Sequence, residues 1–575
     1  MKIPETTADL QQTLGKEMSS KRALLIDRYP NARTSLRMTL SAMGVGLIDN
    51  AGTSADVFRQ LRAHRFDIIL SDYLLEDERD SQQLLEELRA QQLLPRSTVF
   101  IVITSERAYH NVASVAELAP DDYLIKPFTA HELNVRLARA LHKKRFFAPL
   151  YEHLDNGAYI EALATCERLI RQDSGFRFDA LRFKGEILNT LGSHAEAQRV
   201  YQQVLAQRAV PWARMGLAMA LRGQQQMSEA EAFGQSLIDD FPEFIAAYDF
   251  LAEVQEEVGK LPEAQEVLQR AAMISPNNST RQRMVGDVAA RNQDLQVAEK
   301  AYGKVLQRRR NSSLRDIDDY TNLSRVMLDR GHTTAARLVT EELRRDWRGN
   351  QQGEFAALVM ESLCANKEGE PAKAKRAVEK ALLLHETLKD EGRAAAVSEK
   401  LALDLAHACL VTGDEENARE IVRRIAAENH ENRIMIAQVQ SIYAKTGKAA
   451  DGQALLAQVG REIVELNNRG VLAARRGDVE GSVKLLMEAA ERVPNLQFLV
   501  NATKAIFTLL ERKGWDPVLA RRGIRFLQLA QAREMRNPKV VSARELYQRV
   551  ARKYGVATVP FSASGTLRSK GSSFL

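Results

Sequence analysis

The most informative stretch of this sequence is VFIVITS at residues 99–105, in which five apolar residues precede a threonine and a serine. A second stretch, DIILSD, occupies residues 67–72 and also ends on polar residues. Strands that are buried on both faces of a sheet read as continuous apolar runs, whereas half-exposed strands alternate. Both stretches therefore predict central strands of a parallel sheet, each with polar residues at its carboxyl end.

Shorter apolar runs and amphipathic segments on either side complete a βα pattern. The further runs lie at residues 23–26, 46–48 and 123–125, and the run at 46–48 is the weakest. The segments with helical periodicity lie at residues 31–43, 54–65, 81–91 and 131–143. Five strands with intervening helices predict an α/β doubly wound five-stranded parallel sheet over residues 21–145. In such a sheet a ligand binds at the carboxyl ends of the strands.

Four of the predicted strands are followed by a residue that can take part in phosphoryl chemistry. In chain order these residues are Asp27, Asp72, Thr104 and Lys126. Two carboxylates, a hydroxyl and an ammonium group at one edge are what phosphoryl transfer to a carboxylate requires. One carboxylate is the nucleophile and the other helps to hold Mg²⁺, while the hydroxyl and the ammonium group neutralise the phosphoryl oxygens.

These residues and their spacing resemble the receiver domain of bacterial response regulators. The resemblance implies that Asp72 is the phospho-acceptor and that Thr104 and Lys126 are the switch hydroxyl and the phosphate-pairing lysine. It also implies that the rotamer of Tyr123 reports the switch. Under this resemblance the cofactor is Mg²⁺, held by Asp27 and Asp72, and the phosphoryl donor is a histidine kinase or a phosphotransfer protein.

One residue departs from the receiver pattern. The family carries two adjacent acidic residues after the first strand, whereas this chain has Asp27 followed by Arg28. A guanidinium can form a bidentate pair with a carboxylate, which would lower the pKa of Asp72 and compete with the metal. Two interpretations stay open. Either Arg28 points outward and a weakened metal site still supports phosphorylation, or the domain is a pseudo-receiver held in one state.

Beyond residue 145 the strand pattern ends and helical sequence continues to about residue 555. Small and large residues recur at a spacing near that of the tetratricopeptide (TPR) repeat, which the sequence resembles most clearly over residues 245–276. The matching positions there are Tyr248, Leu251, Ala252, Gly259, Ala264, Leu268, Ala271 and Pro276. Residues 146–503 are therefore predicted to form an all-α TPR-like solenoid of about nine to eleven hairpins.

The resemblance to TPR arrays implies a concave groove that binds an unknown protein or peptide. Candidates on the exposed faces of first helices are Arg182, Arg214 and Asn322. Each of them also has a simpler interpretation as an ordinary solvated surface residue.

The end of the chain is strongly basic. The formal net charge of the whole chain is +6, but residues 504–575 hold 15 Lys and Arg against 4 Asp and Glu. The sequence predicts basic capping helices for residues 504–556 and a disordered tail for the Ser- and Gly-rich residues 557–575. The alternative is a surface that binds an acidic protein, nucleic acid or an anionic surface, although no helix-turn-helix signature or zinc spacing is present.

Length and composition narrow the class of protein. The 575 residues exceed one hydrophobic core, and no apolar run is long enough for a membrane span. The polar residues 1–20 are interpreted as a flexible leader.

The three scattered cysteines, Cys166, Cys364 and Cys409, fit a reducing cytosol, so we expect a cytoplasmic protein. The repeat region has no phosphate loop, metal-spaced histidines or nucleophile elbow, so we expect no enzyme.

The leading hypothesis is a two-component response regulator. Its receiver would accept a phosphoryl group on Asp72 and control the protein–protein interactions of the repeat arm. The first alternative is a phosphorylation-independent pseudo-receiver and TPR scaffold. The second alternative is a nucleic-acid-associated regulator that acts through the basic C-terminus.

Overall fold

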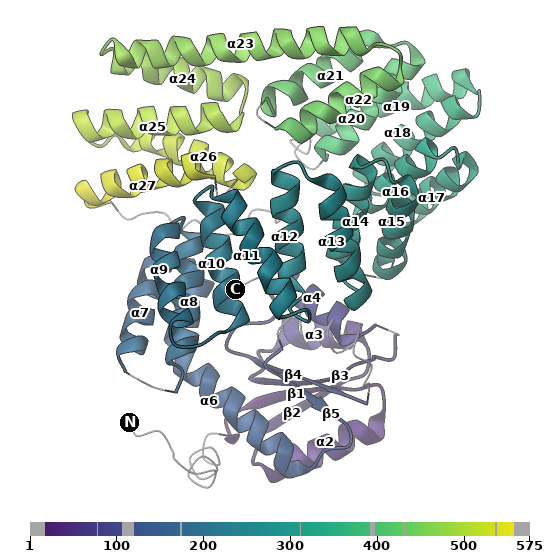
Figure 1. Ribbon diagram of the computed structural model, residues 1–575. Coiled ribbons are helices and arrows are strands. Elements are labelled where there is room, and N and C mark those ends of the chain that lie inside the picture. Colours follow the sequence, from purple (N-terminus) through teal and green to yellow (C-terminus); the bar gives the residue numbers. More distant parts are fainter. Residues whose placement is uncertain are drawn as a thin grey trace. The chain divides into compact units, whose positions relative to one another are not determined.

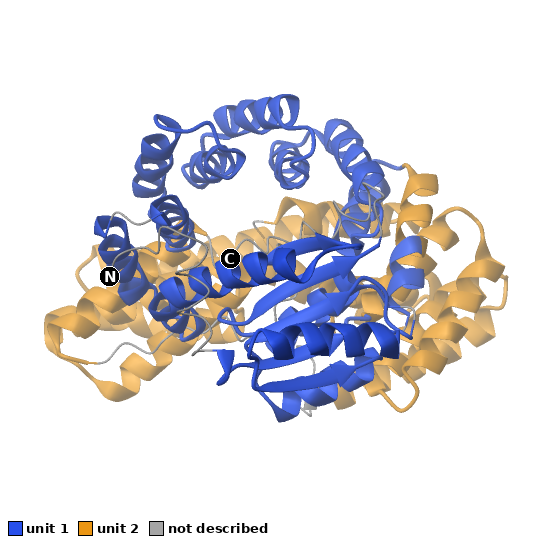
Figure 2. Cartoon of the chain, turned by 90° about the horizontal axis from the view of Figure 1, so that it is seen from below, with its two compact units in different colours: residues 1–293, 304–315, 569–575 blue, residues 294–303, 316–568 orange. Residues whose placement is uncertain are grey.

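The chain divides into two compact units, which are described separately (Figure 2). The first contains residues 1–293 and 304–315, and the second contains residues 294–303 and 316–568. The computed structural model describes residues 18–77, 79–105, 120–172, 175–310, 312–390, 397–430, 432–534 and 537–556. Most of the predicted leader and the whole predicted disordered tail lie outside the described residues.

Five parallel strands form one sheet in the order β2-β1-β3-β4-β5 (Figure 1). Their bounds are β1 Arg22–Ile26, β2 Leu47–Ala51, β3 Ile68–Asp72, β4 Val99–Thr104 and β5 Asp122–Ile125. All residues of β4 are buried, as its unbroken apolar run predicts. The edge strand β2 is buried only at its last residue, which explains why its apolar run is short. The predicted doubly wound parallel sheet is confirmed.

Among the described residues, two helices cover each face of this sheet. The helices are α2 (Pro30–Ala42), α3 (Ser54–Ala63), α4 (Ser81–Ala90) and α6 (Ala130–Asp155). Alternate strand residues point to opposite faces, so Leu25 packs with α2 and α6 whereas Leu24 packs with α3 and α4. Side-chain caps fix where three of these helices begin, because Thr53, Asp80 and Thr129 each accept a hydrogen bond from a backbone N–H in the first turn.

Helix α6 passes through residue 145 without interruption. Its first half packs on the sheet through Leu133 and Leu137. Its second half carries Phe147 and Tyr151, which pack against the aromatic rings of the next helices. The last helix of the α/β domain is therefore also the first helix of the repeat region.

The rest of the first unit consists of paired helices that form an arc (Figure 2). They are α7 (Tyr159–Arg171), α8 (Arg177–Thr190), α9 (His194–Leu205), α10 (Pro211–Gly223), α11 (Met227–Asp240), α12 (Ala246–Glu257), α13 (Leu261–Ile274) and α14 (Ser279–Arg291). Neighbouring helices pack along this series. The next helix, α15 (Leu295–Arg309), contributes its last residues to the first unit and its earlier residues to the second.

The second unit continues the helical pattern. Its helices are α16 (Ile317–Asp329), α17 (Thr333–Asp346), α18 (Gln351–Lys367), α19 (Pro371–Asp390), α20 (Glu399–Thr412), α21 (Glu415–Glu428), α22 (Arg433–Lys445), α23 (Ala449–Arg475), α24 (Val479–Arg492), α25 (Leu496–Lys513), α26 (Pro517–Glu534) and α27 (Pro538–Lys553). The predicted all-α repeat region is confirmed. Among the described residues, no helix combines the length and apolar character that a membrane crossing needs.

Glycines let the helices of the repeats approach closely. A Cβ atom built on Gly216 in α10 would lie 2.2 Å from Cζ of Tyr201 in α9, and one built on Gly185 in α8 would lie 2.5 Å from it. Tyr201 itself is only 1% exposed, so its ring fills the space that both glycines leave. Gly259, between α12 and α13, has φ +87°, a left-handed conformation that glycine adopts without strain. Gly259 is one of the positions at which the sequence matches the TPR pattern.

Candidate phosphoryl-acceptor site

Three of the predicted site residues meet at the carboxyl edge of the sheet. The Nζ atom of Lys126 lies 2.8 Å from Oδ1 of Asp72 and 3.1 Å from Oδ2 of Asp27. The side chain of Asp27 is 1% exposed and that of Asp72 is 11% exposed. A single ammonium group therefore links two carboxylates in a largely water-excluded site.

The strand register explains this meeting. Asp72 is the last residue of β3, Asp27 follows the last residue of β1, and these two strands are paired. The backbone N–H of Lys126 donates to the carbonyl of Thr104 at 2.7 Å, which brings the end of β5 beside the end of β4. The second Asp27 oxygen, Oδ1, accepts a hydrogen bond from the backbone N–H of Tyr29 at 2.8 Å. The Lys126–Pro127 peptide bond is cis.

Burial and charge act in opposite directions at this site. Burial raises the pKa of Asp72 above its usual value, and the nearby charge of Asp27 adds to this effect. The hydrogen bond and positive charge of Lys126 oppose it without cancelling it. For Lys126, burial alone would lower the pKa, but the contacts with Asp72 and Asp27 outweigh burial and raise it. Lys126 therefore stays charged and serves as the cation that both carboxylates need.

The other two predicted residues lie close to this edge. Thr104 ends β4 and is 1% exposed. Tyr123 lies in β5 and packs against the buried cluster under α3 and α4, which includes Leu24 and Ile69. The residue after Thr104 is the small Ser105, which is exposed.

The Arg28 side chain packs on Tyr29 and does not pair with Asp72. Its guanidinium carbon lies 4.7 Å from the centroid of the Tyr29 ring, in a cation–π arrangement. Within the part of the chain that the structure describes, the guanidinium forms no ion pair with a carboxylate, and its Nε has no hydrogen-bond partner. The bidentate Arg28–Asp72 pair that the sequence left open is not formed, and Asp72 pairs with Lys126 instead. The stacking partner of Arg28, Tyr29, was missed by the sequence reasoning although it is adjacent in the chain.

We expect the replacement Arg28→Ala to change the stability of the α/β domain by less than about 1 kcal/mol, because only a partly exposed stacking contact is lost. Urea unfolding of the full chain, followed through hydrogen exchange of the β1 and β3 amides, measures this change. A loss of about 3 kcal/mol or more would instead indicate a buried pair between Arg28 and a carboxylate.

The donor set at the strand ends is compatible with Mg²⁺. This ion commonly takes one or two carboxylates from a protein and completes its octahedron with water and phosphate oxygens. Asp27 and Asp72 supply that number of carboxylates. No larger cluster of His, Cys, Asp and Glu able to hold a metal occurs among the described residues. A magnesium ion at this edge would therefore take its carboxylate ligands from these two side chains.

The predicted groove residues are mostly engaged in contacts within the repeats. Arg182 pairs with Glu186 at 2.8 Å, and Arg214 pairs with Asp240. Asn322 is only 6% exposed, so the prediction of an exposed groove residue is wrong at this position. Its side-chain oxygen accepts a hydrogen bond from Arg325, which in turn pairs with the buried Asp404 of α20.

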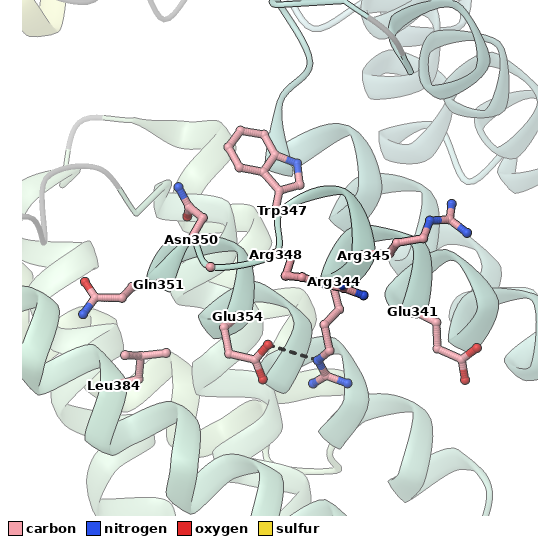
Figure 3. Close-up of a pocket in the computed structure, with 10 residues that line it drawn as sticks. Glu341, Arg344, Arg345, Trp347, Arg348, Asn350, Gln351, Glu354 and Leu384 are labelled. Atoms are coloured by element: carbon pink, nitrogen blue, oxygen red, sulfur yellow. Dashed lines mark hydrogen bonds and ion pairs between the residues drawn. The ribbon is translucent and has the colours of Figure 1, made fainter.

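One cavity of about 580 Å³ lies in the second unit, between the end of α17, the start of α18 and α19 (Figure 3). Arg344 lines it and pairs with Glu354 at 3.1 Å and with Glu361 at 2.9 Å. Acidic partners thus compensate this arginine within the cavity wall.

The doubly wound sheet and the Asp27–Lys126–Asp72 arrangement define a domain of the receiver type. In agreement, residues 23–138 match the response regulator receiver domain. Residues 151–211 and 190–243 match the tetratricopeptide repeat. The chain thus joins an N-terminal response regulator receiver domain to TPR repeats, as the sequence resemblances predicted.

The chain is similar to two curated proteins that are named as transcriptional regulators. The alkaline phosphatase synthesis transcriptional regulatory protein PhoP of Bacillus subtilis is 26% identical over 133 residues, which are 23% of this chain and 53% of that protein. The probable transcriptional regulator ycf27 of Cyanidium caldarium is 26% identical over 120 residues, which are 21% of this chain and 46% of that protein. The chain spans about half the length of these relatives.

Two solved structures of TPR proteins are similar to parts of this chain. The C-terminal part of a TPR repeat-containing protein from Cytophaga hutchinsonii has a TM-score of 0.35 and 16% identity, over 42% of this chain and 96% of that one. A tetratricopeptide repeat protein from Parabacteroides merdae has a TM-score of 0.31 and 12% identity, over 52% of this chain and 98% of that one.

Proposed function

We propose that this protein is a response regulator in which Asp72 accepts a phosphoryl group and the TPR arm binds a protein partner as the output. The observation that carries the proposal is the pairing of Lys126 with both Asp72 and Asp27, while Arg28 stacks on Tyr29. The acceptor carboxylate is thereby left facing a lysine, which can move to a phosphoryl oxygen as charge develops there.

The proposed transfer forms one bond and breaks another. An oxygen of the Asp72 carboxylate attacks phosphorus, and the phosphorus–nitrogen bond of a phosphohistidine in the donor protein breaks. The released imidazole takes up a proton, and Asp72 becomes an acyl phosphate. The ammonium group of Lys126 and the hydroxyl of Thr104 would neutralise the phosphoryl oxygens. Mg²⁺, when held by Asp27 and Asp72, would supply further positive charge.

The output is proposed to be regulation through binding, with no enzymatic reaction in the repeat arm. Receiver and TPR domains are generally regulatory and interaction modules. The three free cysteines are buried, and burial raises the pKa of Cys166 and Cys409 to about 12 and that of Cys364 to about 11. They are therefore poor nucleophiles. A cytoplasmic location, which free thiols favour, is part of the proposal.

Acetyl phosphate with Mg²⁺ is expected to label the full chain with one phosphoryl group, located at Asp72 by peptide mass spectrometry. The variant Asp72→Asn should remain unlabelled, because an amide lacks the nucleophilic carboxylate oxygen. If the wild-type protein stays unlabelled while Arg28→Asp becomes labelled at Asp72, phosphorylation is ruled out for the natural sequence. The phosphorylation-independent scaffold would then be the better account.

A second candidate function rests on the basic C-terminal helices. Several arginines there pair with acidic residues, for example Arg522 with Glu491 and Arg549 with Glu511. Such pairs agree with the simpler interpretation of these helices as capping helices. In contrast, Arg521 and Arg525 on α26 are exposed and form no ion pair within the described part of the chain. Salt-sensitive binding of nucleic acid that is lost in the double variant Arg521→Glu/Arg525→Glu would support this candidate, and no binding at low salt would exclude it.

A further inference from the structure

The outer helix α4 of the receiver is covered by a segment of the repeat arm that is far away in the sequence. Both belong to the first unit, which includes residues 304–315. The guanidinium of Arg308, near the end of α15, lies 2.7 Å from Oδ2 of Asp80. The side-chain amide of Gln83 donates to the backbone carbonyl of Arg308 at 2.9 Å. One arginine is thus held through both its side chain and its backbone.

The same segment buries an acidic residue of α4. Glu87 is only 1% exposed, and its carboxylate accepts hydrogen bonds from the hydroxyl of Ser312 at 2.8 Å and from that of Ser313 at 2.6 Å. Arg79 of the receiver supplies the positive charge at 3.2 Å. Since a buried carboxylate without such donors is costly, the burial of Glu87 depends on the serines staying in place.

Two further contacts extend the covered area along α4. At its end, the side-chain amide of Gln91 donates to the hydroxyl of Ser313 at 2.8 Å. In its middle, burial raises the pKa of Glu86 to about 7, although the charges of Arg309 and Arg308 oppose this rise. The contact is thus buried at Glu87 and reaches the surface at the Gln91–Ser313 hydrogen bond.

We propose that this face of α4 is an interaction surface whose occupant is the chain's own arm. The surface, here called the α4 face, consists of Asp80, Gln83, Glu87 and Gln91. Its occupant, here called the clasp segment, consists of Arg308, Ser312 and Ser313. The α4 face recognises the basic end of a helix that is followed by side-chain hydroxyl groups. While the clasp segment is bound, the α4 face is closed to any other protein.

The position of Asp80 supports the intramolecular assignment. Its Oδ1 accepts the hydrogen bond from the backbone N–H of Gln83 that caps α4, at 2.9 Å, while Oδ2 pairs with Arg308. Each oxygen of the carboxylate thus has its own donor, one from the receiver and one from the arm. Because a change at Asp80 would also weaken the helix cap, the test places its substitutions in the arm.

Hydrogen exchange of the full-length protein tests the clasp. The variant Arg308→Glu should raise the exchange rate of the α4 amides, residues 81–91, by about tenfold, because a charge-assisted contact becomes a repulsion. The matched control is Lys304→Glu, which makes the same charge change one helical turn earlier. Lys304 is exposed and forms no ion pair in the described part of the chain, so its variant should exchange like wild type.

A second variant distinguishes the loss of the clasp from a local folding defect in α15. Ser312→Ala/Ser313→Ala removes the donors to Glu87 without adding charge and should raise α4 exchange in the same direction. Exchange of the β4 amides should stay unchanged in all variants, which shows that the receiver is folded. The proposal is overturned if both arm variants exchange at α4 like wild type. It is also overturned if wild-type protection falls on dilution, because a second copy then supplies the segment.

Discussion

Replacing Lys126 by alanine is expected to destabilise the receiver domain by about 3 kcal/mol at neutral pH. The side chain of Lys126 is 28% exposed and is the cation held by Asp72 and Asp27. Its loss leaves two carboxylates facing each other in a largely water-excluded site. Both burial and mutual repulsion then oppose their negative charges.

The destabilisation should depend on pH in a defined direction. The pKa of Asp72 is already raised in the folded protein, so its neutral form is favoured by folding. A carboxyl group of this kind contributes stability at a pH below its unfolded pKa and loses that contribution as the pH rises through its folded pKa. Without Lys126 the pKa of Asp72 rises further. The difference between wild type and variant should therefore be largest at neutral pH and shrink as the pH falls toward 4.

The measurement is urea unfolding of the full chain between about pH 4 and pH 8, read from hydrogen exchange of the β3 amides. A matched control is Lys21→Ala. Lys21 pairs with Asp67 at 2.8 Å in the same domain, but both side chains are about one-third exposed. An exposed pair of this kind should contribute less than about 1 kcal/mol. Equal losses in the two variants would contradict the role assigned to Lys126.

Replacing Gly216 by alanine is expected to destabilise the repeats of the first unit by about 2 kcal/mol. The added Cβ would lie 2.2 Å from the ring of Tyr201, which is 1% exposed and also touches the position of Gly185. The ring therefore has little room to move away. This overpacking should outweigh the gain in helix propensity, which is about 1 kcal/mol when alanine replaces glycine in a helix.

The matched control for this prediction is Gly303→Ala. Gly303 also lies inside a helix, α15, but a Cβ there would meet no atom within 4 Å. The control should stabilise its helix by about 0.5–1 kcal/mol. Thermal unfolding of both variants, with hydrogen exchange of α8–α10, reads the two effects. If Gly216→Ala is as stable as wild type, the close approach of α9 and α10 is not tightly packed at Tyr201.

Local sequence patterns were sufficient for the architecture because each strand and helix carries its own periodicity. The unbroken apolar run of residues 99–103 predicts a fully buried strand, and β4 is buried throughout. The same reasoning placed Asp72 and Lys126 at one edge, because parallel strands bring their carboxyl ends together. The last receiver helix was predicted to end at residue 143, whereas α6 continues to Asp155. That continuation is stabilised by aromatic contacts with later helices, which the helix's own sequence does not reveal.

The sequence by itself therefore predicted the receiver fold, the TPR-like arm and the meeting of Asp72 and Lys126 at one edge of the sheet. Only the tertiary structure decided the two points on which mechanism depends. Arg28 stacks on Tyr29, whereas Asp72 pairs with Lys126, and this pair exists only once the ends of β3 and β5 have met. The clasp joins Asp80 to Arg308, which are 228 residues apart. No local periodicity encodes such a pair, because its energy comes from burying complementary charges that only folding brings into contact.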